Sequence, residues 1–168
     1  MSFGEKILDY KADIITDLTE LISIKSVSGF QDDCTQALDW MMKKAESFGL
    51  VTKSYEGLAG HAQLGEGGKI CGVLSHLDVV PEGNNWNTLP FELSVGDGYM
   101  YGRGVADDKG AALISLYCLK ALKDNGVIGK NTQNGAVVLS APDNGEYANS
   151  TFFVTTRGAE DRMRIGKA

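Results

Sequence analysis

The segment KICGVLSH, from Lys69 to His76, is a short and continuously apolar run that ends in a histidine. A run of this length and composition is typical of a β-strand buried on both faces, as in the sheet of an α/β protein. A second run of the same kind, NGAVVLSA, covers residues 134–141. Both runs therefore fit strands of a sheet that is covered by helices.

Three segments between and around these runs show the three-to-four spacing of apolar residues that predicts amphipathic helices. They cover residues 3–24, 31–48 and 109–124. Residues 58–64 predict a further strand, and the Pro-, Gly- and Asn-rich stretch 81–99 predicts a loop. Helices that alternate with strands favour an α/β layered fold with a largely parallel sheet.

Composition excludes several classes of protein. The 168 residues fit one domain, and the net charge of −6 argues against a nucleic-acid partner. No apolar run approaches the ~20 residues that span a membrane, and the N-terminus does not resemble a signal peptide. Three cysteines, an odd number without a Cys-x-x-Cys pair, argue against a disulfide framework. We therefore expect reduced thiols and a cytoplasmic location.

His76 and Asp78 lie at the end of the first apolar run. Because side chains alternate along an extended backbone, residues two apart point to the same side. An imidazole with a carboxylate behind it suits a metal ligand whose tautomer is fixed by a second group. A structural histidine that caps a strand end is the alternative, and the pair taken alone favours that alternative.

The segment GRGVADDKG, residues 102–110, places two adjacent carboxylates among three glycines, just before a predicted helix. Glycines permit close approach of the backbone. Asp107 or Asp108 can cap the helix, but one cap explains only one of the two aspartates. A carboxylate here and the histidine 31 positions earlier, both expected at strand ends, can share one divalent cation.

Together, SHLDVVP, the following Trp and Pro-Phe, and YGRGVADDKGAA resemble the metallopeptidase family of aminoacylases, carboxypeptidases and bacterial dipeptidases. The likeness is greatest to the cytoplasmic, non-specific dipeptidases of the Xaa-His dipeptidase and carnosinase type. It covers about residues 1–140. The resemblance implies a three-layer zinc-exopeptidase domain into which a smaller lid domain is inserted. It also implies two zinc ions, with manganese or cobalt as possible substitutes, and a dipeptide or small N-acyl amino acid as substrate.

The resemblance also implies roles for individual residues. His76 matches a ligand of one zinc ion, and Asp107 matches the carboxylate that bridges both. Asp78 matches the acid behind the histidine, and Trp86 and Phe91 match positions near the mouth of the site. In the family, the metals lower the pKa of a bridging water, and a glutamate acts as the general base in attack on a peptide carbonyl.

The chain departs from the family pattern after the second apolar run, where two adjacent glutamates are expected. Asp143 stands in the position of the base and Asn144 in the position of the metal ligand, within PDNGEY. Glu146 can substitute only if the loop takes another path. In a second alignment, APDNGEY matches a later family segment in which an aspartate binds the other zinc ion, which requires a large internal deletion.

The family's late histidine has no counterpart, because the other histidine of the chain, His61, precedes His76. We therefore expect residues 1–154 to form the N-terminal part of a catalytic domain that lacks its lid and C-terminal half. Residues 155–168 form a tail for which no structure is predicted. Three hypotheses follow: a dipeptidase only partly present, a truncated and inactive remnant, or a half-enzyme completed by a partner chain that covers an exposed sheet edge.

Overall fold

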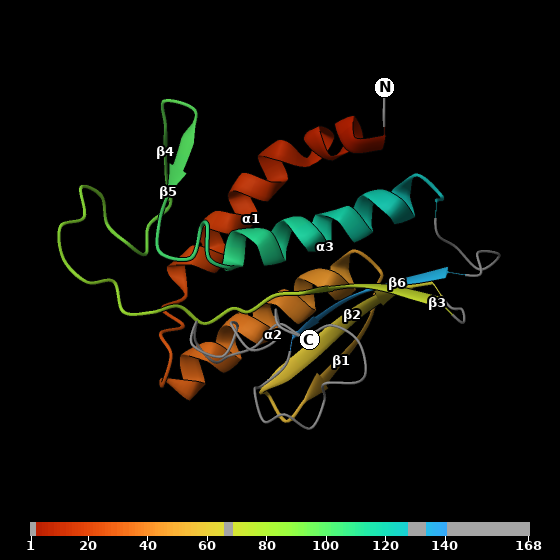
Figure 1. Ribbon diagram of the computed structural model, residues 1–168, viewed down its shortest axis with the longest axis horizontal. Coiled ribbons are helices and arrows are strands. Elements are labelled where there is room, and N and C mark those ends of the chain that lie inside the picture. Colours follow the sequence, from red (N-terminus) through yellow and green to blue (C-terminus); the bar gives the residue numbers. More distant parts are fainter. Residues whose placement is uncertain (1–2, 66–68, 128–133, 141–168) are drawn as a thin grey trace, which may run out of the picture.

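The computed structural model describes residues 3–65, 69–127 and 134–140. A 3-10 helix, η1, runs directly into the first α-helix, and a four-stranded sheet and a separate two-stranded hairpin follow along the chain (Figure 1). The elements are η1 (Phe3–Tyr10), α1 (Lys11–Ser23), α2 (Gln31–Ser47), β1 (Val51–Tyr55), β2 (Ala59–Leu64), β3 (Lys69–Leu74), β4 (Ser94–Gly96), β5 (Tyr99–Tyr101), α3 (Lys109–Asp124) and β6 (Asn134–Ser140).

The larger sheet has the strand order β1-β2-β6-β3. β3 and β6 pair in parallel, whereas β1–β2 and β2–β6 are antiparallel. The prediction of a largely parallel sheet is therefore wrong for these four strands. β1 and β2 are joined by a short turn in which Glu56 and Gly57 have φ values of 54° and 70°. So short a connection can join only antiparallel strands, because a parallel pair needs a long crossover.

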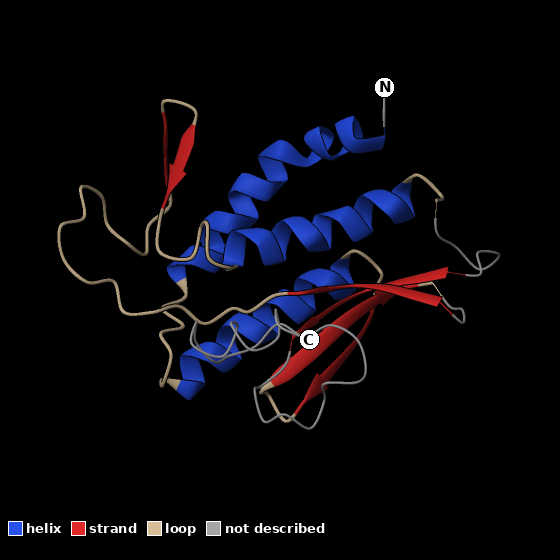
Figure 2. Cartoon of the chain, in the orientation of Figure 1, coloured by secondary structure: helices blue, strands red, loops and turns tan. Residues whose placement is uncertain are grey.

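The three α-helices lie on one face of the sheet (Figure 2). α2 packs on β1 and β2, α3 packs on β6 and β2, and α1 packs mainly on α3. At Gly60 the sheet and α2 are so close that a Cβ atom would lie 2.7 Å from the Met42 sulfur. Two layers are therefore present among the described residues, and they enclose one apolar core. The expected α/β class is confirmed, and the described residues supply helices for one face only.

The helices agree well with the expected boundaries. α2 and α3 match the predictions of 31–48 and 109–124, while the predicted helix 3–24 is divided into η1 and α1. β1 was not predicted, because all but one of its residues are exposed and its sequence carries no apolar pattern. The hairpin β4–β5 begins within the predicted loop 81–99.

One prediction about β3 is wrong for the side chains that the structure describes. Val73 and Leu74 are 40% and 37% exposed, although the strand was expected to be buried on both faces. The reason is the strand order: β3 is the last strand of the described sheet, next to β6 alone.

Among the helices that the structure describes, none has the length and apolar character needed to cross a membrane.

Candidate metal centre

His76 lies two residues beyond β3 and is almost completely buried, as is Asp78. The imidazole Nδ1 lies 2.9 Å from the Asp78 carboxylate Oδ1 and 2.9 Å from the Asp78 main-chain oxygen. Both of these oxygens are acceptors, so Nδ1 carries the proton and Nε2 faces away from Asp78. The two side chains lie on the same side of the backbone, as the alternation of an extended chain predicts.

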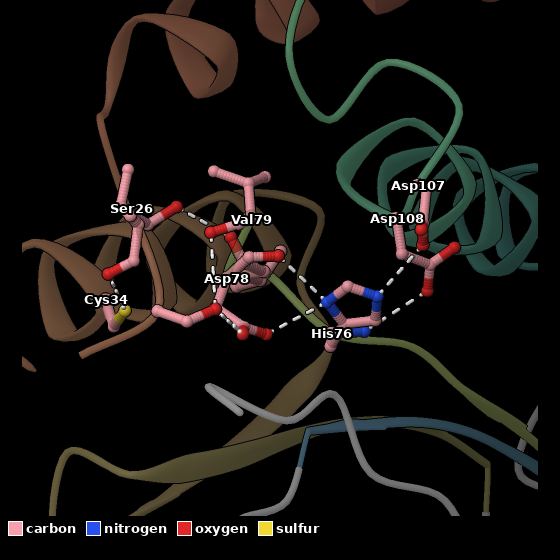
Figure 3. A network of polar contacts seen from close by, with 10 residues as sticks. Ser26, Cys34, His76, Asp78, Val79, Asp107 and Asp108 are labelled. Carbon is pink, nitrogen blue, oxygen red and sulfur yellow. Dashed lines mark hydrogen bonds and ion pairs between the residues drawn. The ribbon is translucent and has the colours of Figure 1, made fainter. Parts of the chain in front are cut away.

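Asp107 faces the other nitrogen of the same imidazole. Its Oδ1 lies 3.1 Å from His76 Nε2, and its side chain is 61% exposed whereas that of His76 is 5% exposed. Figure 3 shows the ring between Asp78 on one side and Asp107 and Asp108 on the other. Asp107 was expected at a strand end, and this prediction is wrong. The residue lies in the connection that leads directly into α3.

Asp108 occupies the N-cap position of α3 but makes no side-chain capping hydrogen bond. Its Oδ2 instead accepts a hydrogen bond of 3.2 Å from the main-chain N–H of His76. The alternative in which this aspartate caps the helix is therefore wrong for Asp108. The peptide bond between Asp107 and Asp108 is cis. Both carboxylates of the pair are directed at His76, one at its ring and one at its backbone.

Gly104 lets the segment 102–108 approach the histidine segment closely. Its φ is 96°, a conformation that residues with a side chain rarely adopt. A Cβ atom at this position would lie 3.0 Å from Val79 Cγ1 and 3.1 Å from Lys109 Cδ. Gly104 is therefore one glycine of this segment that a larger residue could not replace without strain.

Two groups of this site were not predicted. Lys109 is fully buried, and its ammonium donates hydrogen bonds to the main-chain oxygens of Leu21, at 3.0 Å, and Ile24, at 2.6 Å. Burial lowers the pKa of Lys109 to about 8. Ser28 donates a hydrogen bond of 2.6 Å to Asp78 Oδ2 from 50 positions away. Neither contact has a signal in the sequence, because each partner is distant along the chain.

Trp86 and Phe91, which were predicted near the mouth of the site, have contacts that the structure describes. Trp86 donates its indole N–H to the Glu82 main-chain oxygen at 2.6 Å, and the Arg103 guanidinium lies 5.2 Å from the centre of its ring. Phe91 is buried, with the Lys25 ammonium 5.6 Å from its ring centre. A role for Trp86 and Phe91 at the mouth of the site stays a prediction. Three more candidates, Asp143, Asn144 and Glu146, and the tail 155–168 lie outside the described residues.

His76 and Asp107 fit part of a zinc site. Donor atoms 3.1 Å apart are close enough for one ion with bonds of about 2.0–2.2 Å to reach both. Nε2 is the nitrogen available for such a bond, because Nδ1 is engaged with Asp78. Within the described ranges no group of three or more histidine, cysteine or acidic side chains is placed to hold a metal ion. The described residues therefore bring two side chains of ligand type together, and they do not form a complete set of ligands.

Cys34 lies next to this network and provides a first test of its packing. Burial raises the pKa of the Cys34 thiol to about 11. We expect iodoacetamide to label Cys34 in the native chain about tenfold faster for each pH unit up to about 11, because only the thiolate reacts. In the same pH window the unfolded chain loses this proton first, so the free energy of unfolding should fall between about pH 9 and 11.

Mass spectrometry of the labelled chain distinguishes Cys34 from the exposed Cys118. Cys118 serves as the internal reference and should be modified first. Equal labelling of both residues near pH 8 would contradict the burial of Cys34.

The chain is similar to known proteins in sequence and in fold. Residues 72–139 match the model of "Peptidase family M20/M25/M40". The Bacillus subtilis (strain 168) protein named "Putative dipeptidase YtjP" is 36% identical over 133 residues, which are 74% of this chain and 29% of the relative. A Staphylococcus haemolyticus protein with the same kind of name is 39% identical over 129 residues, 71% of this chain and 28% of the relative.

Solved structures show the same fold. Human carnosine dipeptidase 1 superposes with a TM-score of 0.69 at 22% identity, over 82% of this chain and 33% of that chain. The di-peptidase Dug1p of Saccharomyces cerevisiae gives 0.69 at 24% identity, over 80% and 33%. The chain thus spans less than a third of the length of the curated relatives it matches. These matches include the segment that carries His76, Asp78 and Asp107, and residues 72–139 of the chain are similar to peptidase family M20/M25/M40.

Proposed function

We propose that this chain contributes His76 and Asp107 as ligands to the divalent metal centre of a dipeptidase. The observation that carries the proposal is the position of the His76 imidazole. Its Nδ1 is engaged by the buried Asp78, and its Nε2 lies 3.1 Å from the exposed Asp107 carboxylate. A metal-ligating imidazole commonly donates its other N–H to a carboxylate, and here a second, accessible carboxylate faces the nitrogen that remains for the metal.

Zinc is the metal that the family favours, and the complete centre of the family holds two ions. When bound, zinc would lower the pKa of a bound water so that hydroxide is available near neutral pH. The residues of this chain have separate tasks. His76 and Asp107 would hold the ion, and Asp78 would keep the imidazole proton on Nδ1, so that the Nε2 lone pair could bind the metal. Asp143 is proposed as the general base, from its position in the sequence. The substrate class is a dipeptide or small N-acyl amino acid, and the location is cytoplasmic.

Zinc titration of the purified chain tests the ligand assignment. The wild-type chain should bind zinc, and His76→Ala should weaken binding at least about 100-fold, since loss of a mere supporting partner costs 10–100-fold. His61→Ala is the matched control. That histidine lies on β2, where its ring contacts Tyr55, and its removal should leave the zinc affinity unchanged. Equal affinity of the wild-type chain and His76→Ala would refute the assignment.

Hydrolysis of a simple dipeptide with added zinc or manganese tests the activity separately. Turnover by the wild-type chain above the His76→Ala background would support a dipeptidase that works with the residues present here. Zinc binding through His76 without turnover would keep the metal site and reject activity of this chain alone. That result would favour a half-enzyme that needs a partner chain.

A further inference from the structure

We propose that Ser28 is a positioning residue that acts through Asp78 to hold the tautomer and orientation of His76. Ser28 is far from Asp78 in the sequence and belongs to the segment Ile24–Ser28, here called the strap. The strap runs from the end of α1 and passes alongside residues 77–79. The inference deepens the proposed function, because it concerns the support of the same metal-binding nitrogen.

The strap is bonded to the histidine segment along its backbone. Val27 and Val79 form a parallel bridge, with Ser28 N–H donating to the Val79 oxygen at 2.9 Å and Val79 N–H donating to the Ser26 oxygen at 2.8 Å. The Ser26 hydroxyl adds a bond of 2.6 Å to the Leu77 main-chain oxygen. Figure 3 shows Ser26 of the strap and Val79 of the histidine segment close to Asp78. Ser26 therefore supports the main chain of the segment and does not contact the carboxylate of Asp78.

Ser28 differs from Ser26 in its target. Its hydroxyl lies 2.6 Å from Asp78 Oδ2 and 3.2 Å from the Val79 oxygen, so the single proton is better placed on the carboxylate. The other carboxylate oxygen, Oδ1, accepts from His76 Nδ1. The χ2 torsion of an aspartate is broad and has no sharp preference of its own. Two hydrogen bonds, one at each oxygen, therefore set the plane of this fully buried carboxylate.

The strap also contacts the other half of the site. Ile24, at its start, accepts a hydrogen bond of 2.6 Å from the buried ammonium of Lys109, the residue that follows Asp107 and Asp108. One short segment thus holds both the carboxylate behind His76 and the first turn of α3. Ser28 is the strap residue whose side chain bonds to Asp78, and this makes it the point at which the relay can be tested.

The test is imidazole-selective ¹H–¹⁵N NMR of the metal-free chain, which has only two histidines. His76→Gln assigns the signals. We expect a slowly exchanging Nδ1–H signal for His76 in the wild-type chain and exchange about tenfold faster in Ser28→Ala, because one bond that orients its acceptor is gone. Ser28→Thr keeps the hydroxyl and should restore slow exchange.

Ser26→Ala is the matched control, since it removes a strap hydroxyl that bonds only to the main chain. It should lower stability and leave the His76 signal as in the wild-type chain. Wild-type exchange in Ser28→Ala, or equally fast exchange in Ser26→Ala, would overturn the proposal. Should Ser28→Ala fail to fold, Ser28→Cys carries the same test with a weaker donor of similar size.

The measurement separates this inference from the proposed function. A wild-type Nδ1–H signal that depends on Ser28, in a chain that does not bind zinc, would keep the positioning role and reject the metal centre. If the chain binds zinc through His76 and Ser28→Ala has no effect on the Nδ1–H signal, the metal centre is kept and the positioning role of Ser28 is rejected.

Discussion

Gly110→Ala is expected to lower the free energy of unfolding by about 3 kcal/mol, the upper part of the range for overpacking in a tight interior. Gly110 is the second residue of α3, and its N–H donates to the Gly104 oxygen. A Cβ atom there would lie 2.0 Å from the Val105 main-chain oxygen. Because that neighbour is backbone, it cannot rotate away, and either α3 or the segment 102–108 must move.

The same displacement should weaken metal binding, because Asp107 and Asp108 lie between the two colliding residues. Urea unfolding and zinc titration measure the two effects. Helix propensity alone favours alanine over glycine by about 1 kcal/mol, so a net loss of stability isolates the clash. Gly96→Ala is the matched control, since nothing lies within 4 Å of its Cβ position. If both variants unfold at the same urea concentration, the close approach at Gly110 is wrong.

Asp17→Ala is expected to lower the free energy of unfolding by about 2–3 kcal/mol, because it leaves a buried hydroxyl without its acceptor. Asp17 lies in α1 and joins the three helices. Its Oδ1 forms an ion pair of 2.8 Å with Lys44 of α2, and its Oδ2 accepts a bond of 2.6 Å from the Tyr117 hydroxyl of α3. Asp13→Ala, on the exposed side of α1, should change stability by less than about 0.5 kcal/mol.

The pH dependence of unfolding gives a second measurement on this network. Burial, together with the hydrogen bond to Asp17, raises the pKa of Tyr117 above its ordinary value. Above about pH 10 the unfolded chain therefore releases a proton that the folded chain retains, and the free energy of unfolding falls as the pH rises. Tyr117→Phe should be less stable at neutral pH and lose less stability between about pH 10 and 12.

Tyr10 contributes in the same direction, since burial, with the hydrogen bond to Asp124, raises its pKa to about 12. The comparison of Tyr117→Phe with the wild-type chain cancels this contribution, which both share. An identical loss of stability in the two chains at alkaline pH would mean that the Tyr117 hydroxyl is not held by Asp17.

Local patterns predicted the helices well because each helix satisfies its own backbone hydrogen bonds and places one apolar face on the core. The boundaries of α2 and α3 followed from apolar spacing alone. The sheet was predicted less well. β1 carries no apolar pattern, and the pairing of β2 with β6 joins segments that are far apart in the chain. Pairing direction depends on connections and partners, which a single strand does not record.

For the site, the sequence by itself determined which side chains are present and one local relation. His76 and Asp78 are two positions apart, a spacing at which side chains on an extended backbone share a side, and the structure places Nδ1 and Oδ1 2.9 Å apart. Only the tertiary structure decided that Asp108 bonds to the His76 backbone rather than capping α3, and that Ser28 completes the support of Asp78. These contacts join residues that are 32 and 50 positions apart in the sequence. They form only because α1, the strap and α3 pack around the end of β3.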